Sequence, residues 1–175
     1  MESANIVIIG AGVVGLAVAA KVSESNEGVY VFEKNARHGQ ETSSHNSGVI
    51  HSGIHYPKNS LKAKLCVKGN TLMYKLCERY RIPFKRLGKL TVAVEEEEVD
   101  ELDKLMRAGT ENGVEGLRFL DGETVRKLEP CVEVEKALLT PSTGILEPDE
   151  LMNHFYAQTR KNNVALATET EVTSI

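Results

Sequence analysis

A glycine-rich turn near the N-terminus constrains the fold of this chain more than any other feature. Gly10, Gly12 and Gly15 follow an apolar, β-branched run at 5–9 and open a small-residue helix predicted over 13–23. The first glycine permits a tight turn, the second lets the backbone approach a pyrophosphate, and the third lets helix and strand pack closely. The helix N-terminus offers N–H groups and a positive dipole end to phosphates. The pattern predicts a dinucleotide-binding βαβ unit and favours it over a purely structural glycine turn.

An acidic residue ends the second strand of this unit. The strand is predicted over 28–32, and Glu33 follows it directly. A carboxylate here accepts hydrogen bonds from a ribose diol and repels a 2′-phosphate, which disfavours NADP. The glycine motif by itself does not distinguish NAD from FAD.

The remaining pattern alternates between strands and helices, which indicates an α/β fold. The segment 35–59 has no periodicity, and a connection of this length inside a compact domain is usually functional. A strand at the very end would be an exposed edge, which natural proteins avoid, so we expect these 175 residues to be part of a longer or split protein. Further helices are predicted over 61–80, 95–112, 121–129 and 148–161, and further strands over 90–94, 137–140, 164–168 and 171–175.

Charge and composition exclude several classes. The formal net charge of −4 argues against a nucleic-acid binder, which needs a basic surface. No apolar run approaches the roughly 20 residues that span a bilayer, and the apolar stretch 6–20 has no cleavage site typical of a signal peptide. The three cysteines form no CxxC pair and indicate a reducing compartment. We therefore expect a cytoplasmic protein without a transmembrane segment, and peripheral membrane association stays open.

The segment 39–56, GQETSSHNSGVIHSGIHY, resembles the D-amino-acid oxidase superfamily of FAD-dependent oxidoreductases. Within it, the chain is most similar to the L-2-hydroxyglutarate dehydrogenase family, through HNSGVIHSGIHYPKNSLKAKLCVKGN, GKLTVAV and PSTGILEPDEL. The resemblance covers the whole chain and implies FAD as the cofactor and a 2-hydroxy acid as the small-molecule substrate. Flavin-dependent glycerol-3-phosphate dehydrogenases share a similar turn and are the second hypothesis. A non-catalytic dinucleotide-binding fragment is the third.

The resemblance also implies the residues of the site. His51 matches the position beside the flavin and substrate, where it could take the hydroxyl proton while a hydride passes to flavin N5. Orienting the flavin or binding a carboxylate is an equally open role for this histidine. The cofactor residues implied are Gly10, Gly12, Val14 and Gly15 of the phosphate loop, Glu33 at the ribose with Lys34 next to it, Thr42, Ser43 and Ser44 at the second pyrophosphate contact, and Val172, whose backbone meets the adenine.

A metal site is not expected. His51 and His55 are four residues apart, a spacing suited to two ligands on a helix, but Gly48 and Gly53 make a helix there unfavourable. No acidic or cysteine partner lies nearby in the sequence.

The expected architecture is a doubly wound, Rossmann-like FAD-binding domain interrupted by the start of an α+β substrate-binding domain. The FAD-binding domain is expected over 1–82 and again over 147–175, with the substrate-binding domain over 83–146. We expect the fold to be incomplete and to be completed by a C-terminal half or by a second copy. Little turnover is therefore expected from these residues by themselves.

Overall fold

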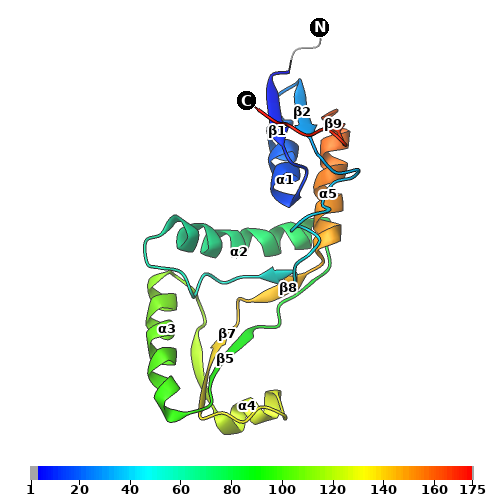
Figure 1. Ribbon diagram of the computed structural model, residues 1–175. Coiled ribbons are helices and arrows are strands. Elements are labelled where there is room, and N and C mark those ends of the chain that lie inside the picture. The colour runs from blue at the N-terminus through cyan, green and yellow to red at the C-terminus, as the bar shows by residue number, and fades with distance from the viewer. Residues whose placement is uncertain (1–3, 175) are drawn as a thin grey trace. The chain divides into compact units, whose positions relative to one another are not determined.

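The computed structural model describes residues 4–174, and the chain divides into two compact units. Unit 1 combines the chain up to Gly48, the short piece Tyr80–Pro83 and the chain from Glu147 onward. Unit 2 combines Val49–Arg79 with Phe84–Leu146. Figure 1 labels the helices and strands of both.

Unit 1 is built on a parallel sheet with the strand order β1–β2–β9. Its strands are β1 (Ile6–Ile9), β2 (Val29–Phe32) and β9 (Ala165–Ala167), and its helices are α1 (Val13–Val22) and α5 (Pro148–Lys161). Each of these elements begins and ends within one residue of its predicted bounds. The α/β class and the βαβ unit at the start of the chain are confirmed.

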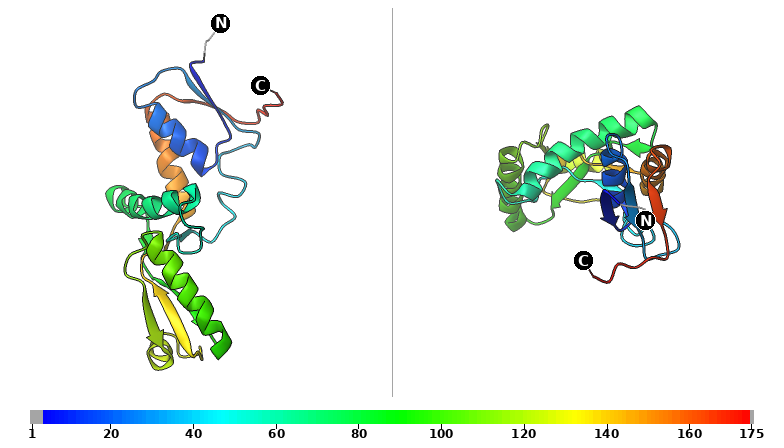
Figure 2. Two further views of the ribbon diagram at one scale, coloured as in Figure 1. Left: turned by 90° about the vertical axis from the view of Figure 1, so that its left-hand side faces the viewer. Right: turned by 90° about the horizontal axis from the view of Figure 1, so that it is seen from above.

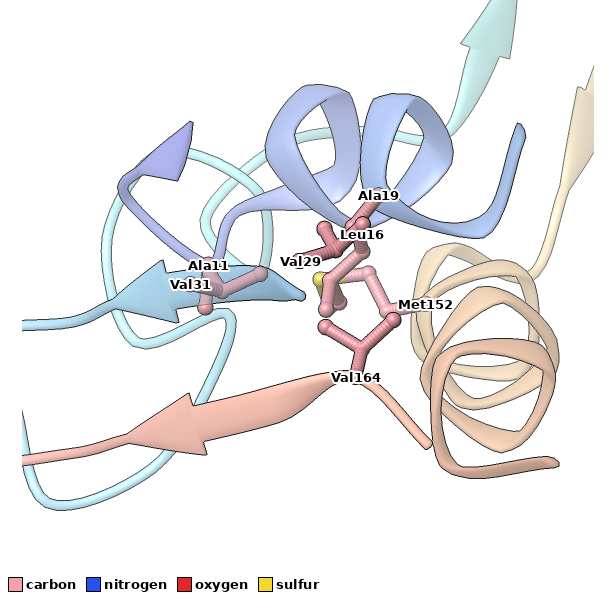
Figure 3. Packing of buried hydrophobic residues seen from close by; sticks show 7 residues of the cluster. All are labelled: Ala11, Leu16, Ala19, Val29, Val31, Met152 and Val164. Atoms are coloured by element: carbon pink, nitrogen blue, oxygen red, sulfur yellow. The ribbon is translucent and has the colours of Figure 1, made fainter. Parts of the chain in front are cut away.

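Helices α1 and α5 pack together on one face of this sheet (Figure 3). On the other face, Val7 and Ile9 of β1 are 49% and 54% exposed. An apolar, β-branched run such as this is typical of a strand buried on both faces, but within residues 4–174 β1 is covered on one face only, because both helices described there lie on the same side. The buried core of unit 1 consists of Ala11, Leu16, Ala19, Val29, Val31, Met152 and Val164.

Unit 2 contains an antiparallel sheet with the order β5–β7–β6. Its strands are β5 (Lys89–Ala93), β6 (Arg118–Asp121) and β7 (Lys136–Thr140). Helix α3 (Val99–Glu111) follows a short 3₁₀ turn at Glu96–Glu98 and lies along this sheet (Figure 2). The buried residues Ile54, Ala93, Leu102, Val114 and Leu138 form the core between them.

The short helix predicted over 121–129 is observed and begins after Asp121. Helix α4 covers Gly122–Leu128, and the Asp121 carboxylate accepts a hydrogen bond from the Thr124 N–H at 2.8 Å. This hydrogen bond lowers the pKa of the Asp121 carboxyl, because it favours the ionised form.

The long helix α2 (Leu61–Tyr80) belongs almost entirely to unit 2. A second sheet in this unit pairs β3 (Val49–Ile50), β8 (Gly144–Leu146) and β4 (Phe84–Lys85) in the order β3–β8–β4. The compact units therefore divide the chain differently from the expected domains, which grouped residues 1–82. The physical reason is that β3 pairs with β8, and that α2 side chains hydrogen-bond to the turn before β8.

The predicted strand at 171–175 is not observed over 171–174, and its last residue lies outside the described part of the chain. Glu169 has a positive φ of 51°, which interrupts the extended backbone. The N–H groups of Glu169 and Thr170 donate to the carbonyls of Asn35 and Glu33 instead of to a ladder. The chain after β9 therefore runs as a loop past the end of β2.

Candidate cofactor site

The phosphate loop between β1 and α1 folds back on itself. Gly10 has a φ of 95°, in the left-handed region that favours glycine. At Gly15, an added Cβ would lie 1.9 Å from the Gly10 carbonyl oxygen, so no larger residue fits without a backbone shift. The Gly10 N–H donates to the Phe32 carbonyl at 2.8 Å and ties the loop to β2.

A buried carboxylate supports the same loop from the end of β2. Glu33 is only 6% exposed. Its Oε2 accepts the Ala11 N–H at 2.8 Å, and its Oε1 accepts the Asn35 N–H at 2.9 Å. An ionised carboxylate has about four acceptor positions, so it retains capacity for hydroxyl donors after these two bonds. This arrangement suits recognition of a ribose diol.

The N-terminus of α1 has N–H groups available for an anion. The Val13 N–H donates to Ser43 Oγ at 3.0 Å, whereas the N–H groups of Val14 and Gly15 have no hydrogen-bond partner within residues 4–174. The first turn of the helix carries no acidic side chain. A Cβ added to Gly12 would lie 2.9 Å from Ser43 Oγ, so a larger residue would press on this contact. Phosphate oxygens are the natural ligands of such a helix end.

A cavity of about 350 Å³ lies at this end of unit 1. Its volume falls within the range of roughly 300–1,000 Å³ typical of small-molecule sites. Ile9, Phe32 and Val172 provide apolar wall, as a purine base requires. Six of the predicted cofactor residues line it, namely Gly10, Gly12, Glu33, Lys34, Ser43 and Val172.

The other predicted cofactor residues do not line this cavity. Val14 is 73% exposed, and Gly15 packs beneath the loop. The side chains of Thr42 and Ser44 are exposed, and the Ser44 hydroxyl donates to the Glu41 carbonyl at 3.2 Å. Their contacts with the cofactor stay predictions.

Lys34 and Glu41 form an exposed ion pair on the lining of the cavity. Their Nζ and Oε1 atoms are 3.0 Å apart. The hydrogen bond and the charge of Glu41 raise the pKa of the Lys34 ammonium. The Lys34 hydrogen bond, followed by that of Asn35, lowers the pKa of the Glu41 carboxyl. Both side chains therefore stay charged near neutral pH.

The sequence interpretation missed part of the lining. Gly39, Gln40, Glu41, Thr170 and Glu171 also face the cavity. Among them, the Gly39 N–H donates to the Ala11 carbonyl at 3.1 Å. The available signal was a glycine in the non-periodic segment, and Gly39 indeed has a positive φ of 73°. The residues after β9 gave no comparable signal.

His51 lies in unit 2, directly after β3, and its side chain is exposed. Four residues later, His55 Nε2 lies 2.8 Å from Lys89 Nζ. Burial, then the charge of Lys89, then that of His51 lower the pKa of His55. Within residues 4–174, no group of three or more His, Cys, Asp or Glu side chains is placed to hold a metal ion. The catalytic role of His51 stays a prediction.

The residues of unit 1 fit the ADP half of FAD. The open N-terminus of α1 suits the diphosphate, the buried Glu33 carboxylate suits the ribose, and the apolar wall suits the adenine. Gly12 and Ser43, next to the start of α1, line the same cavity as Glu33 and the apolar wall.

Curated relatives share strong similarity with the chain. It is 49% identical over 151 residues to the mitochondrial L-2-hydroxyglutarate dehydrogenase of Arabidopsis thaliana, covering 86% of this chain and 31% of that protein. It is 41% identical over 176 residues to the mitochondrial L-2-hydroxyglutarate dehydrogenase of Homo sapiens, covering 99% of this chain and 38% of that protein. The chain thus spans about a third of the length of these relatives.

Solved structures match the fold closely. An FAD-bound, dithionite-reduced L-α-glycerophosphate oxidase from Mycoplasma pneumoniae superposes with a TM-score of 0.91 at 32% identity, covering 100% of this chain and 47% of that one. A glycine oxidase from Geobacillus kaustophilus gives a TM-score of 0.86 at 24% identity, covering 98% of this chain and 48% of that one. The second match supports the fold only.

The helices described in residues 4–174 include none with the length and apolar character needed to cross a bilayer. The relatives above are named as mitochondrial proteins. The expected cytoplasmic location is not confirmed and stays a prediction.

The pattern that defines the DAO family, described as FAD dependent oxidoreductase, matches residues 5–175. This match covers nearly the whole chain and agrees with the site in unit 1 and with the FAD-bound structural neighbour. The chain belongs to the DAO family of FAD dependent oxidoreductases.

Proposed function

We propose that the full-length protein oxidises a 2-hydroxy acid of the L-2-hydroxyglutarate type. In this proposal, unit 1 binds the ADP half of FAD, and His51 of unit 2 acts at the substrate. The observation that carries the substrate class is the identity of 49% and 41% to proteins named L-2-hydroxyglutarate dehydrogenase. The match to the human protein extends over 99% of this chain.

The chain's own residues divide the work between binding and proton transfer. The N–H groups at the start of α1 and the Ser43 hydroxyl hold the diphosphate, and Glu33 accepts the ribose hydroxyls. FAD, when bound, supplies a hydride acceptor at N5. His51 accepts the proton of the substrate hydroxyl, for which an imidazole is suited near neutral pH.

A glycerol-3-phosphate oxidising activity is the second candidate. It is favoured by the structural match to an L-α-glycerophosphate oxidase, at a TM-score of 0.91 and 32% identity. Both substrates are secondary alcohols that are oxidised at the carbon bearing the hydroxyl. L-2-hydroxyglutarate presents carboxylates beside it, whereas glycerol 3-phosphate presents a phosphate. We rank it second because the identity to the dehydrogenases is higher.

Anaerobic reduction of the purified full-length protein tests both candidates. We expect a yellow protein that releases FAD on denaturation and whose flavin is bleached by L-2-hydroxyglutarate. Equal amounts of D-2-hydroxyglutarate, glycerol 3-phosphate and glycine serve as comparison substrates. Release of NAD without flavin contradicts the cofactor assignment, and bleaching by glycerol 3-phosphate but not by L-2-hydroxyglutarate replaces the first candidate with the second.

A further inference from the structure

Helix α2, which is labelled in Figure 1, contains a buried amide side chain. Asn70 is only 9% exposed. Its Nδ2 donates to the His51 carbonyl at 3.0 Å and to the Ser142 carbonyl at 2.8 Å. Both amide hydrogens are therefore used, which offsets the cost of burying this polar group.

The two acceptors of Asn70 differ in what else holds them. The Ser142 carbonyl also accepts the Tyr74 hydroxyl at 3.0 Å. Among residues 4–174, the other donor to the His51 carbonyl is the Cys66 thiol, with Sγ at 3.6 Å. Burial raises the pKa of this thiol, so it stays protonated, but an S–H group is a weak donor. Asn70 is therefore the strong restraint on the His51 carbonyl.

We propose that Asn70 is a positioning residue for His51. Its hydrogen bond fixes the peptide plane that follows His51, and through the Cα atom it fixes the direction in which the imidazole leaves the backbone. This inference deepens the proposed function, and its catalytic consequence rests on the role proposed there for His51. A displacement of about 1 Å in a catalytic group can cost on the order of 10²-fold in rate.

The chain offers a matched control. Asn112, at the end of α3, donates from Nδ2 to the Gly53 carbonyl at 3.1 Å and to the Tyr56 carbonyl at 2.7 Å. It makes as many bonds as Asn70 and holds the same loop, but it does not bond to His51. Replacing it measures the effect of loosening the loop in general.

The test compares Asn70→Ala, Asn112→Ala and His51→Ala in the full-length, FAD-loaded protein. We expect Asn70→Ala to slow anaerobic flavin reduction roughly 10- to 100-fold. In the His51→Ala background it should have no further effect, since a residue that acts through His51 loses its effect when His51 is absent. Asn112→Ala should change the rate by less than about threefold, because its two bonds go to the carbonyls of Gly53 and Tyr56 and not to that of His51.

Histidine ring NMR of the same variants provides a readout that does not depend on turnover. The His51 signal, identified by its loss in His51→Ala, should shift in Asn70→Ala and stay unchanged in Asn112→Ala. If no 2-hydroxy acid reduces the flavin, the proposed function fails, while this signal still decides whether Asn70 orients His51. Where Asn70→Ala does not fold, Asn70→Ser, which retains one donor, takes its place.

Two results overturn the inference. One is an equal slowing by Asn70→Ala in the wild-type and His51→Ala backgrounds, which makes Asn70 a general structural residue. The other is an equal effect of Asn70→Ala and Asn112→Ala on the His51 signal.

Discussion

The phosphate loop of unit 1 and the loop 51–56 of unit 2 are held in opposite ways. In the phosphate loop, the backbone folds tightly on glycines, and two N–H groups at the start of α1 have no partner within residues 4–174. In the loop 51–56, side-chain amides of Asn70 and Asn112 hold the backbone carbonyls. The first loop therefore leaves backbone N–H groups available, whereas backbone carbonyls of the second are already hydrogen-bonded.

This difference predicts which substitutions each loop should tolerate. A loop that binds through backbone N–H groups depends on glycines and on a few anchors such as Glu33. In the loop 51–56, the direction of each side chain depends on the residues that hold the backbone, which are Asn70 and Asn112. Four predictions test this contrast.

The largest effect is expected at Gly15. A Cβ there would meet a backbone oxygen at 1.9 Å, which forces the phosphate loop apart. We expect Gly15→Ala to abolish FAD retention in the full-length protein and to destabilise it by about 3 kcal/mol or more. Absorption at 450 nm after gel filtration and thermal unfolding measure the two effects.

Gly69 in α2 is the control for this change, because a Cβ there meets no atom within 4 Å. Gly69→Ala should raise the stability by roughly 0.5–1 kcal/mol, the usual gain for an open helical position. Normal FAD retention by Gly15→Ala would show that the phosphate loop does not need its close backbone approach.

At His51, the side chain rather than the backbone should matter. If His51 is the base, His51→Ala lowers the rate of flavin reduction by roughly 10²–10⁴-fold, the usual contribution of a positioned acid or base. FAD content should stay normal, since the cofactor residues of unit 1 are unchanged. A raised KM with an unchanged kcat would assign His51 to substrate binding. Unchanged reduction kinetics in stopped-flow experiments would remove it from the reaction.

A smaller effect is expected at Glu33. Its replacement leaves the N–H groups of Ala11 and Asn35 without this acceptor and removes the ribose contact that we propose. Glu33→Ala should weaken FAD binding by about 1–3 kcal/mol, as measured by fluorescence titration of the apoprotein. Glu24→Ala, which removes an exposed carboxylate of unit 1 paired with Lys21, should leave the affinity unchanged. Equal affinities of the Glu33 and Glu24 variants would exclude the ribose contact.

The smallest effect is a pH dependence in the loop 51–56. The pKa of His55 is lowered by burial and by the Lys89 charge, so protons bind the unfolded chain more readily than the folded one. The free energy of unfolding should therefore fall as the pH drops below the ordinary histidine value of about 6.5, until the folded His55 also becomes protonated. His55→Gln, which keeps an acceptor for Lys89, should show a weaker dependence in urea unfolding at pH 7.5 and 5.0. An identical dependence in the variant would assign the effect to other groups.

The sequence was most informative where a structure depends on neighbouring residues. The strand, glycine turn and helix at 5–23 were predicted nearly to the residue, because Gly10 and Gly15 are required by backbone conformation and close contact within the same turn. The start of α4 likewise depends on a local contact, between Asp121 and Thr124 three residues away. The strands β3, β4, β6 and β8, each of two to four residues, were missed.

Tertiary structure decided which distant residues share a site. Val172 faces the same cavity as Gly10 because the chain after β9 hydrogen-bonds to the end of β2. Asn70 meets Ser142 across 72 positions of sequence because β8 brings that turn against α2. The glycine spacing by itself determined the phosphate loop, because it acts through local backbone geometry. Contacts between distant segments form only when packing brings the segments together. No regular spacing of residues in the sequence therefore predicts them.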